Sequence, residues 1–205
     1  MRFSSERRVL LNPASPNATQ SAAGDAKRTP MPTPFFTRTI DPVADGPALH
    51  AIFGDEDSCR YMTRPAMPNV EATIAMMSEW AGDGTDINWV IAEAPDGPAL
   101  GRVSIYSHGK NNVWEAACMI APAARGRNLA ARSLALALDH AFDHLGARRI
   151  MADIDPDNTA SIRTFEKLGF TLEGRLRGEW EMHIGIRDSL IYGLLRDDPR
   201  PWRNW

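Results

Sequence analysis

The sequence has few of the features that mark secreted, membrane-spanning or metal-binding proteins. Its only cysteines are Cys59 and Cys118, which are too few for a disulfide framework or a thiolate metal cluster. No apolar stretch approaches the roughly 18–20 residues that span a bilayer. The run Val9-Leu10-Leu11 is shorter than the about 7–15 apolar residues of a secretory signal. We therefore expect a reducing cytoplasmic location, no membrane partner and no bound metal.

Basic charge is scarce outside the N-terminal segment. The formal net charge is −3, and residues 1–34 hold five basic and two acidic side chains, which leaves −6 on residues 35–205. A nucleic-acid-binding surface needs clustered lysine and arginine, so the acidic body argues against a nucleic-acid partner. It suits a cationic or amine-bearing substrate instead.

Composition divides the chain into a domain with a segment at each end. Residues 1–34 are rich in Ser, Ala, Asn and Pro, and this composition predicts a disordered tail. A transit peptide is the alternative interpretation, because Arg2, Arg7 and Arg8 come with little acid. Residues 35–198 form the predicted domain, and residues 199–205 form a short, irregular C-terminal tail.

Strand and helix patterns alternate within the predicted domain. The expected strands cover about 35–40, 88–93, 100–106, 113–120, 149–154, 170–182 and 188–196, and the expected helices lie near 48–53, 74–80, 128–145 and 158–168. Apolar residues repeat at helical spacing in the long helix, which Gly146 ends. A strand, a helix and a further strand in succession predict a parallel strand pair within a mixed α/β sheet.

The segment before the long helix is a candidate phosphate-binding turn. It reads Arg125-Gly126-Arg127-Asn128-Leu129-Ala130. A helix N-terminus offers backbone N–H groups and the positive end of the helix dipole, which suit a diphosphate. Gly126 allows the main chain to approach closely, while Arg125 and Arg127 add positive charge. The segment matches neither the P-loop nor the dinucleotide-binding pattern, and taken alone it fits a plain exposed loop equally well.

A second pattern follows about thirty residues later. Asn158 stands at a predicted helix N-cap, and Ser161 lies three residues inside the same helix. Phe165 and Lys167 follow, and Gly169-Phe170 marks the end of the helix and the start of a strand. The spacing brings Asn158 and Ser161 to one end of the helix, near the strand edge. Each has a structural interpretation as well, Asn158 as a cap and Ser161 as a solvated first-turn serine.

The two patterns together resemble the GNAT N-acyltransferase superfamily. The turn is similar to its pyrophosphate signature, Gln/Arg-x-x-Gly-x-Gly/Ala, with Asn128 where a central glycine is usual. Asparagine tolerates a left-handed backbone best after glycine. The segment 158–170 is similar to Asn-x-x-Ser-x-x-x-Tyr/Phe-x-Lys-x-Gly-Phe at every marked position. The resemblance covers roughly residues 33–197 and implies one α/β domain, a mixed sheet with helices on both faces, and acetyl-CoA as cosubstrate.

The resemblance also implies which residues hold acetyl-CoA. Met119 and Ile120 match the place where the fourth and fifth strands separate, and where backbone N–H groups form an oxyanion site. The implied cofactor-binding set is Met119, Ile120, Arg125, Gly126, Arg127, Asn128, Leu129, Ala130, Asn158, Phe165 and Lys167. No metal site is implied. His140 and His144, four residues apart, are interpreted as an exposed helix face, and Cys118 as buried strand filler.

Acetyl transfer to an amine requires a base and a proton for the leaving thiolate. Glu115 is the preferred base, because many relatives carry a glutamate on the fourth strand. Glu179 and Glu181 on a later strand are alternatives, and each of the three also fits a solvated strand face. Ser161 is the candidate donor to the sulfur, with Tyr192 a distant second.

The predicted function is direct transfer of an acetyl group from acetyl-CoA to a primary amine, by a monomer or homodimer. The opening 35–40, the segment 169–174 and Arg187-Asp188 look most like the ribosomal-protein-alanine N-acetyltransferase branch. That branch acts on protein N-termini, polyamines, aminoglycosides and other amines. The alternatives are a detoxifying acetylase for small amines such as aminoglycosides or polyamines, and a catalytically silent CoA-binding domain.

Overall fold

The computed structural model describes residues 34–80 and 86–205. The predicted N-terminal tail lies outside these residues, apart from Pro34, and stays a prediction. Among the helices in the described part of the chain, none is long and apolar enough to cross a membrane.

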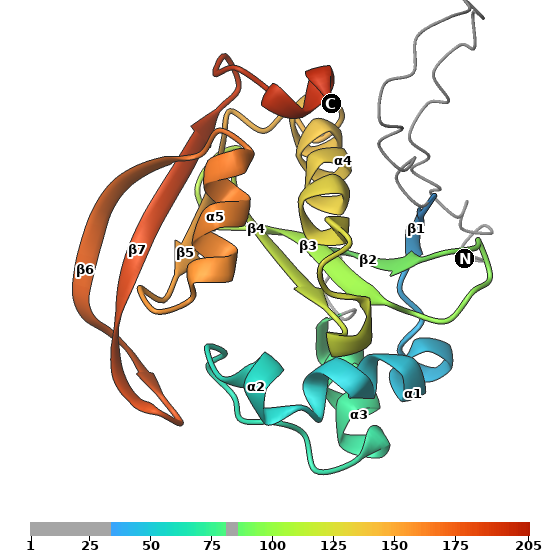
Figure 1. The fold of residues 1–205 in the computed structure, drawn as a ribbon. Coiled ribbons are helices and arrows are strands. Elements are labelled where there is room, and N and C mark those ends of the chain that lie inside the picture. The colour runs from blue at the N-terminus through green and yellow to red at the C-terminus, as the bar shows by residue number, and fades with distance from the viewer. Residues whose placement is uncertain (1–33, 81–85) are drawn as a thin grey trace, which may run out of the picture.

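A seven-stranded mixed sheet organises the molecule (Figure 1). Its strand order is β1-β2-β3-β4-β5-β7-β6. The strands are β1 (Phe36–Thr39), β2 (Ile87–Ala92), β3 (Gly101–Ser107), β4 (Val113–Ile120), β5 (Arg149–Ile154), β6 (Thr171–Met182) and β7 (Gly185–Leu195). Neighbouring strands are antiparallel except β4 and β5, which are parallel because a helix returns the chain between them. The predicted mixed sheet and its parallel pair are confirmed.

Helices cover both faces of this sheet. The helices are α1 (Pro42–Phe53), α2 (Glu56–Cys59), α3 (Val70–Trp80), α4 (Leu129–Asp143) and α5 (Thr159–Lys167). On one face α4 packs over β4, where Ser133 Oγ lies 3.7 Å from Cys118 Sγ, and α5 lies beside α4 (Figure 1). On the other face the Arg102 guanidinium stacks 4.0 Å above the Trp80 ring of α3. The one-turn helix α2 is absent from the prediction, because four residues are too short to show a helical period.

Helix α4 forms because its apolar residues fall on one face. Leu134, Leu138, Ala141 and Phe142 are almost fully buried and recur at helical spacing. Gly146 has φ +70°, and the Ala147 N–H donates to the Ala141 carbonyl at 3.0 Å. This geometry ends a helix through a left-handed glycine, as the sequence predicts.

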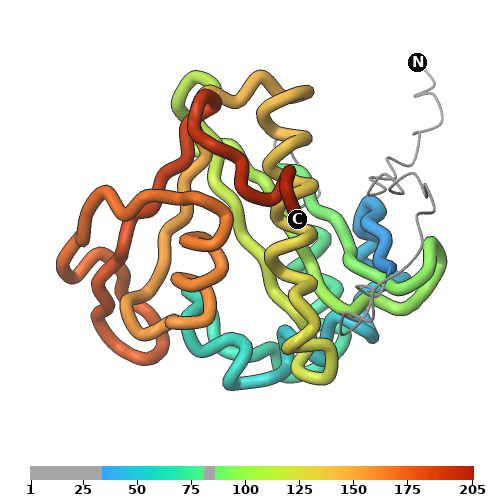
Figure 2. The backbone as a smooth tube through the Cα atoms, turned by 45° about the horizontal axis from the view of Figure 1, so that its top comes forward, coloured from blue at the N-terminus to red at the C-terminus, as the bar shows by residue number. Residues whose placement is uncertain are grey.

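The C-terminal tail is a short 3-10 turn that packs along α4 (Figure 2). Trp202 is 8% exposed, and its indole Nε1 donates to Asp139 at 3.0 Å. Arg200 and Arg203 each donate to Asp139 and Asp143, at distances between 2.9 and 3.2 Å. Asp139 and Asp143, which flank His140 and His144 in the sequence, therefore bind the C-terminal turn to α4.

The histidine prediction is correct for one residue of the pair. His144 is exposed, whereas His140 is partly buried with its ring 5.3 Å from that of Trp89. Burial and the neighbouring His144 lower the pKa of His140. Among the described residues, no group of three or more histidines, cysteines or acids could hold a metal ion.

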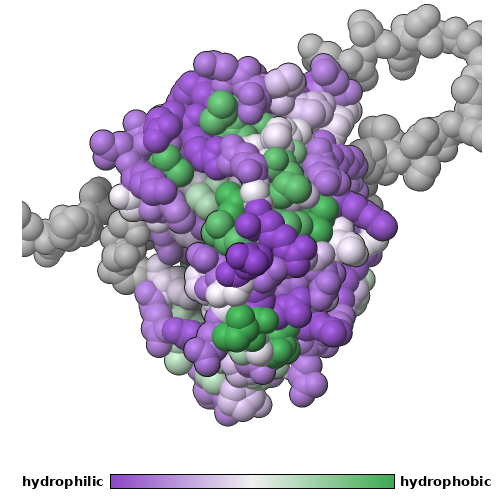
Figure 3. All heavy atoms as spheres, turned by 90° about the vertical axis from the view of Figure 1, so that its left-hand side faces the viewer, coloured by the Kyte–Doolittle hydropathy of each residue, from purple (hydrophilic) through white to green (hydrophobic). Residues whose placement is uncertain are grey.

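The β6–β7 hairpin extends away from the helices and exposes apolar side chains. Leu172, Leu176, Trp180, Ile184 and Ile186 are between 39% and 64% exposed. Figure 3, which views the molecule from this side, shows apolar patches separated by hydrophilic surface. Two of these residues, Leu176 and Trp180, also line the cavity described below.

The packing of the C-terminal turn predicts a measurable loss of stability on truncation of its tryptophan. Trp202→Ala removes a buried indole and its hydrogen bond to Asp139, so the free energy of unfolding should fall by about 3 kcal/mol. Denaturant titration measures the change. Trp205→Ala is the matched control, because Trp205 is 53% exposed in the same segment. Equal losses in the two variants would contradict the buried role of Trp202.

Candidate active site

Strands β4 and β5 separate partway along their length. Their pairing joins residues 113–115 to residues 149–151 and then ends, although β4 continues to Ile120 and β5 to Ile154. Within the described residues, β4 has no strand beside this open edge, so its backbone polar groups there can meet a ligand. Met119 and Ile120, the expected oxyanion residues, lie on this part of β4.

The turn between β4 and α4 has an unusual backbone. Gly126 has φ +78° and Asn128 has φ +57°, both in the left-handed region. Asparagine tolerates this region, so Asn128 can occupy the position where the resembled signature has glycine. A Cβ atom added at Gly126 would have no neighbour within 4 Å, which means that the turn is open on that side.

The N-terminus of α4 differs from that of the other helices. A side-chain oxygen caps α1, α2, α3 and α5, provided by Asp41, Asp55, Asn69 and Asn158 at 2.8 to 3.2 Å. Asn128 makes no such bond to the start of α4; its Oδ1 accepts from Lys167 Nζ at 3.1 Å instead. The first N–H groups of α4 are therefore left without a side-chain cap, and the helix dipole favours an anion there. This arrangement fits the diphosphate of CoA.

The two arginines of the turn have carboxylate or hydroxyl partners in the structure. Arg125 donates to Ser58 Oγ at 2.5 Å and lies 3.5 Å from Asp57. Arg127 pairs with Glu93, directly after β2. The guanidinium groups therefore connect the turn to Ser58 of α2 and to Glu93 after β2.

The segment 158–170 around α5, called the α5 motif below, contacts the turn 125–130 through Lys167. Lys167 joins them by its bond to Asn128, and its ammonium lies 4.6 Å from the ring centroid of Trp205. Asn158 caps α5 by accepting from the Ser161 N–H at 3.2 Å, and Ser161 is partly buried near that end. Phe165 is 4% exposed and packs edge-on against Phe170, so its side chain belongs to the core.

Leu129 and Ala130 begin α4 itself. Leu129 is 2% exposed and is part of the hydrophobic core, and Ala130 is partly buried. Their side chains thus anchor the helix end whose backbone N–H groups face outward.

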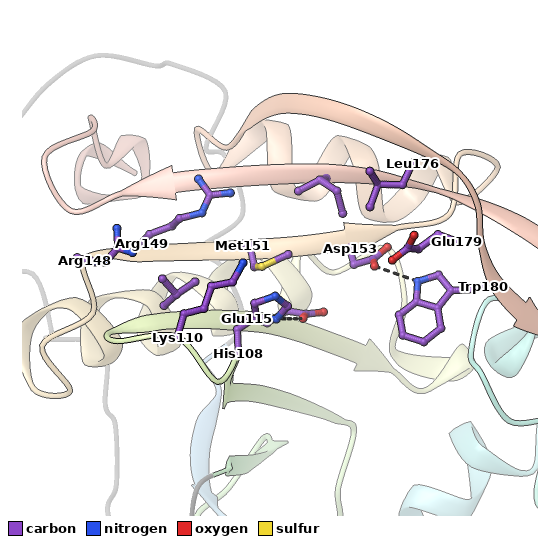
Figure 4. Close-up of a pocket in the computed structure, with 12 residues that line it drawn as sticks. His108, Lys110, Glu115, Arg148, Arg149, Met151, Asp153, Leu176, Glu179 and Trp180 are labelled. Carbon is purple, nitrogen blue, oxygen red and sulfur yellow. Dashed lines mark hydrogen bonds and ion pairs between the residues drawn. The ribbon is translucent and has the colours of Figure 1, made fainter.

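A cavity of about 680 Å³ lies on the sheet face opposite α4, between β4, β5 and the β6–β7 hairpin (Figure 4). Its lining residues are His108, Lys110, Val113, Glu115, Arg148, Arg149, Met151, Asp153, Leu176, Glu179, Trp180 and Ile191. Glu115 is the last residue of β4 that pairs with β5, so the cavity adjoins the point where the strands separate. Glu179 also lines the cavity. Glu181 is exposed, pairs with Ile186 and is not part of the lining.

Glu115 lies in an environment that suits a general base. Tyr106, directly opposite in the strand register, donates its hydroxyl to Glu115 Oε1 at 2.5 Å, and His108 Nδ1 lies 3.6 Å from Oε2. Burial raises the pKa of Glu115 to about 7; the hydrogen bond from Tyr106 lowers it and the charge of Asp153 raises it. A carboxyl group that titrates near neutrality can accept a proton at the working pH.

Asp153 is a second carboxylate in the cavity. It accepts from Trp180 Nε1 at 3.0 Å and from Ser189 Oγ at 2.5 Å. Neither Asp153 nor Tyr106 nor His108 is among the predicted site residues. Asp153 carries a sequence signal, because it is an acid within the otherwise apolar core of its strand. The hydrogen bond from Tyr106 to Glu115 has no signal in the sequence, because it depends on the register between β3 and β4.

Cys118, predicted to fill the strand interior, and Tyr192, the second candidate proton donor, lie outside the cavity. Burial raises the pKa of Cys118 to about 12, so its thiol stays protonated, consistent with a packing role. Tyr192 is 2% exposed and its hydroxyl donates to Glu166 at 3.2 Å.

A comparison with protein-family models matches residues 38–171 to the family described as acetyltransferase (GNAT) domain. The chain belongs to the GNAT acetyltransferase family. Its members use acetyl-CoA, which agrees with the uncapped end of α4.

Relatives of this acetyltransferase span most of its length. The uncharacterised N-acetyltransferase YoaA of Bacillus subtilis (strain 168) is 26% identical over 156 residues, covering 74% of this chain and 88% of its own. The structure of a GNAT acetyltransferase from Bacillus anthracis has a TM-score of 0.72 and 20% identity, covering 80% of this chain and 96% of that one. The Vibrio cholerae spermidine N-acetyltransferase, in complex with CoA and spermine, has a TM-score of 0.70 and 19% identity, with the same coverage. These structures share the fold.

The raised pKa of Glu115 predicts that the stability of the acetyltransferase depends on pH. Its folded pKa of about 7 exceeds the usual 4.5, so protonation favours the folded state, and this stabilisation is lost as pH rises from about 4.5 through 7. In Glu115→Gln, the free energy of unfolding should decline less over this range than in the wild type. The exposed Glu181→Gln is the control and should follow the wild type. Superimposable pH curves for wild type and Glu115→Gln would rule out the shift.

Proposed function

We propose that this acetyltransferase moves an acetyl group from acetyl-CoA directly to a primary amine, with Glu115 as the general base. The observation that carries the proposal is the position of the Glu115 carboxyl. It lies in the cavity, at the last residue pair before β4 and β5 separate, and titrates near neutrality.

The geometry supports a reaction in which the two substrates approach from opposite faces. The uncapped end of α4 and the α5 motif lie on one face of the sheet, and the cavity lies on the other. In this proposal the two substrates meet where β4 and β5 separate, beyond residues 115 and 151. Acetyl-CoA held by the turn 125–130 would bring its thioester to this point, while an amine in the cavity would reach it from beside Glu115.

Each step of the transfer then has a candidate group. Glu115 accepts a proton from the attacking ammonium or from a water between them, so that the nitrogen lone pair can form the new N–C bond. The backbone N–H group of Ile120 stabilises the charge that develops on the carbonyl oxygen, because it points to the open edge of β4, whereas that of Met119 points to β3. As the C–S bond breaks, Ser161 gives a proton to the thiolate. Its hydroxyl has no hydrogen-bond partner among the described residues, so it is available for this role.

We also propose the ribosomal-protein-alanine branch as the place of this chain within the family, and the cytoplasm as its location. The segment 169–174 and Arg187-Asp188 support the branch. Arg187 there donates to Asp155 at 2.7 Å and also bonds Asp157, which holds β7 against the loop before α5. The acceptor is the amine of a protein N-terminus or of a small molecule.

Loss of the base should affect turnover and leave cofactor binding intact. Glu115→Gln keeps the shape of the side chain but cannot accept the proton, so kcat should fall by roughly 10²–10⁴-fold. The CoA dissociation constant, measured by calorimetry, should not change. The wild-type rate should rise as pH passes about 7, where Glu115 ionises, and the deficit of the variant should shrink at higher pH as the amine itself deprotonates.

Glu181→Gln is the control for this experiment, because Glu181 is exposed and outside the cavity lining. It should retain near wild-type turnover. An inactive Glu181→Gln beside an active Glu115→Gln would move the base to β6.

Asn128→Gly tests the phosphate turn. Glycine adopts the left-handed backbone at lower cost and keeps the N–H group, so CoA should bind equally or more tightly. Calorimetry measures the affinity. Asn112→Gly is the matched control, since Asn112 has φ +56° in the β3–β4 loop, away from the turn. A sharp loss of affinity in Asn128→Gly alone would instead assign a direct ligand contact to the Asn128 side chain.

A further inference from the structure

The cavity beside Glu115 has charges of opposite sign at its two ends. Figure 4 shows Lys110, Arg148 and Arg149 on one side of Glu115, with Asp153, Glu179 and Trp180 on the other. The strand register gives the same order, because Arg149 pairs at Val113, Met151 pairs at Glu115, and Asp153 lies two residues further along β5. At about 3.3 Å per residue, Arg149 and Asp153 are separated by roughly 13 Å of strand.

The basic end retains positive charge. Arg149 forms a bidentate pair with Glu173, which neutralises it. The Arg148 Nε donates to the Asn111 carbonyl, a neutral group, at 3.0 Å. Among the described residues no carboxylate pairs with Arg148 or Lys110, and both are exposed at the mouth of the cavity. Two cations therefore remain available to a ligand at this end.

The acidic end is organised differently. Asp153 is held by Trp180 and Ser189, while Glu115 is held by Tyr106, so both carboxylates are fixed in direction. Between the two ends the walls are apolar. Val113 lies opposite Arg149 and Met151 lies opposite Glu115, so these two side chains line the wall from the basic end to Glu115, whereas Ile191 lies opposite Asp153 at the acidic end. A ligand that fills the cavity would thus meet carboxylates, an apolar stretch and cations in order.

We propose that the acceptor is a primary amine that also carries an anionic group, a carboxylate or a phosphate, separated from the amine by an apolar spacer. The amine lies beside Glu115 and the anionic group pairs with Lys110 and Arg148. This inference rests on the proposed function, because it assigns the acceptor to the cavity that contains the proposed base. A diamine that extends from Glu115 towards the basic end would place its second ammonium beside two cations, Lys110 and Arg148.

The first experiment compares matched acceptors at saturating acetyl-CoA. A series of ω-amino carboxylates of increasing chain length is assayed beside the corresponding carboxamides, diamines and ω-aminoalkyl phosphates, and CoA release and product mass are measured. We expect kcat/KM to be at least about tenfold higher for the acids or phosphates than for the carboxamide of equal length, the size of one charge-assisted hydrogen bond. Comparison of carboxylate with phosphate identifies the anion.

The second experiment removes the two cations together. Lys110→Ala/Arg148→Ala should raise KM for the preferred acid about tenfold or more and leave kcat and the KM for its carboxamide unchanged. The control is Arg163→Ala, which removes an exposed arginine from α5 on the other face of the sheet and should leave both KM values unchanged. Charge reversal, Lys110→Glu/Arg148→Glu, should turn the preference towards the diamine.

Two outcomes overturn the inference while leaving the proposed function intact. One is that carboxamides or diamines are acetylated as well as the acids. The other is that the double variant raises KM equally for acid and carboxamide.

A measurement without turnover separates this inference from the proposed function. Calorimetry with Glu115→Gln and the ω-amino carboxylate should detect binding, which the further change Lys110→Ala/Arg148→Ala weakens about tenfold. If this binding is observed and the wild-type protein acetylates no amine, the proposed function is refuted and the assignment of the cavity is supported. If Glu115→Gln does not bind the ω-amino carboxylate and the wild type does not prefer the acid to its carboxamide, the inference is refuted.

Discussion

The parallel pairing of β4 with β5 joins only three residues of each strand, from Val113 to Glu115 and from Arg149 to Met151. Beyond these pairs the strands are no longer paired, and the proposed mechanism uses the open edge of β4 as a passage between the two faces of the sheet. The end of α4 approaches this passage from one side, and the cavity with Glu115 approaches it from the other. If the pairing continued to Ile120, the backbone N–H group of Ile120 would be used within the sheet, as that of Met119 already is through β3. Glu115 would then lie along an unbroken strand pair.

The elements around the passage support one another across long distances in sequence. Asn128 in the turn accepts from Lys167 at the end of α5, so the two motifs form one unit. Arg125 joins the turn to α2, and the Tyr61 hydroxyl donates to the Asp157 carbonyl at 3.4 Å in the loop before α5. The segment around α2 thus contacts both parts of the proposed cofactor site. Behind them, the C-terminal turn fixes the outer side of α4 through its acids.

The order and type of the main strands and helices could be predicted, because they depend on local periodicity and on Gly and Pro signals. The turn and the α5 motif were also readable, since each lies within one continuous segment. The partners of Arg125 and Arg127, by contrast, come from α2 and β2, and no local pattern reports them. The environment of Glu115 could not be predicted either, because its partners lie on other strands. It depends on register between strands, and a shift of one residue would turn Tyr106 to the other face.

Tyr106 and Glu115 depend on each other through one hydrogen bond. Burial and the nearby carboxylate raise the pKa of Tyr106, so its hydroxyl stays protonated and donates to Glu115 at any pH near neutrality. A carboxyl group without that donor would ionise less readily, and a tyrosine without that acceptor would leave a polar group poorly satisfied. Positions 106 and 115 are therefore coupled in this chain, and a change at one alters the hydrogen bonding and ionisation of the other.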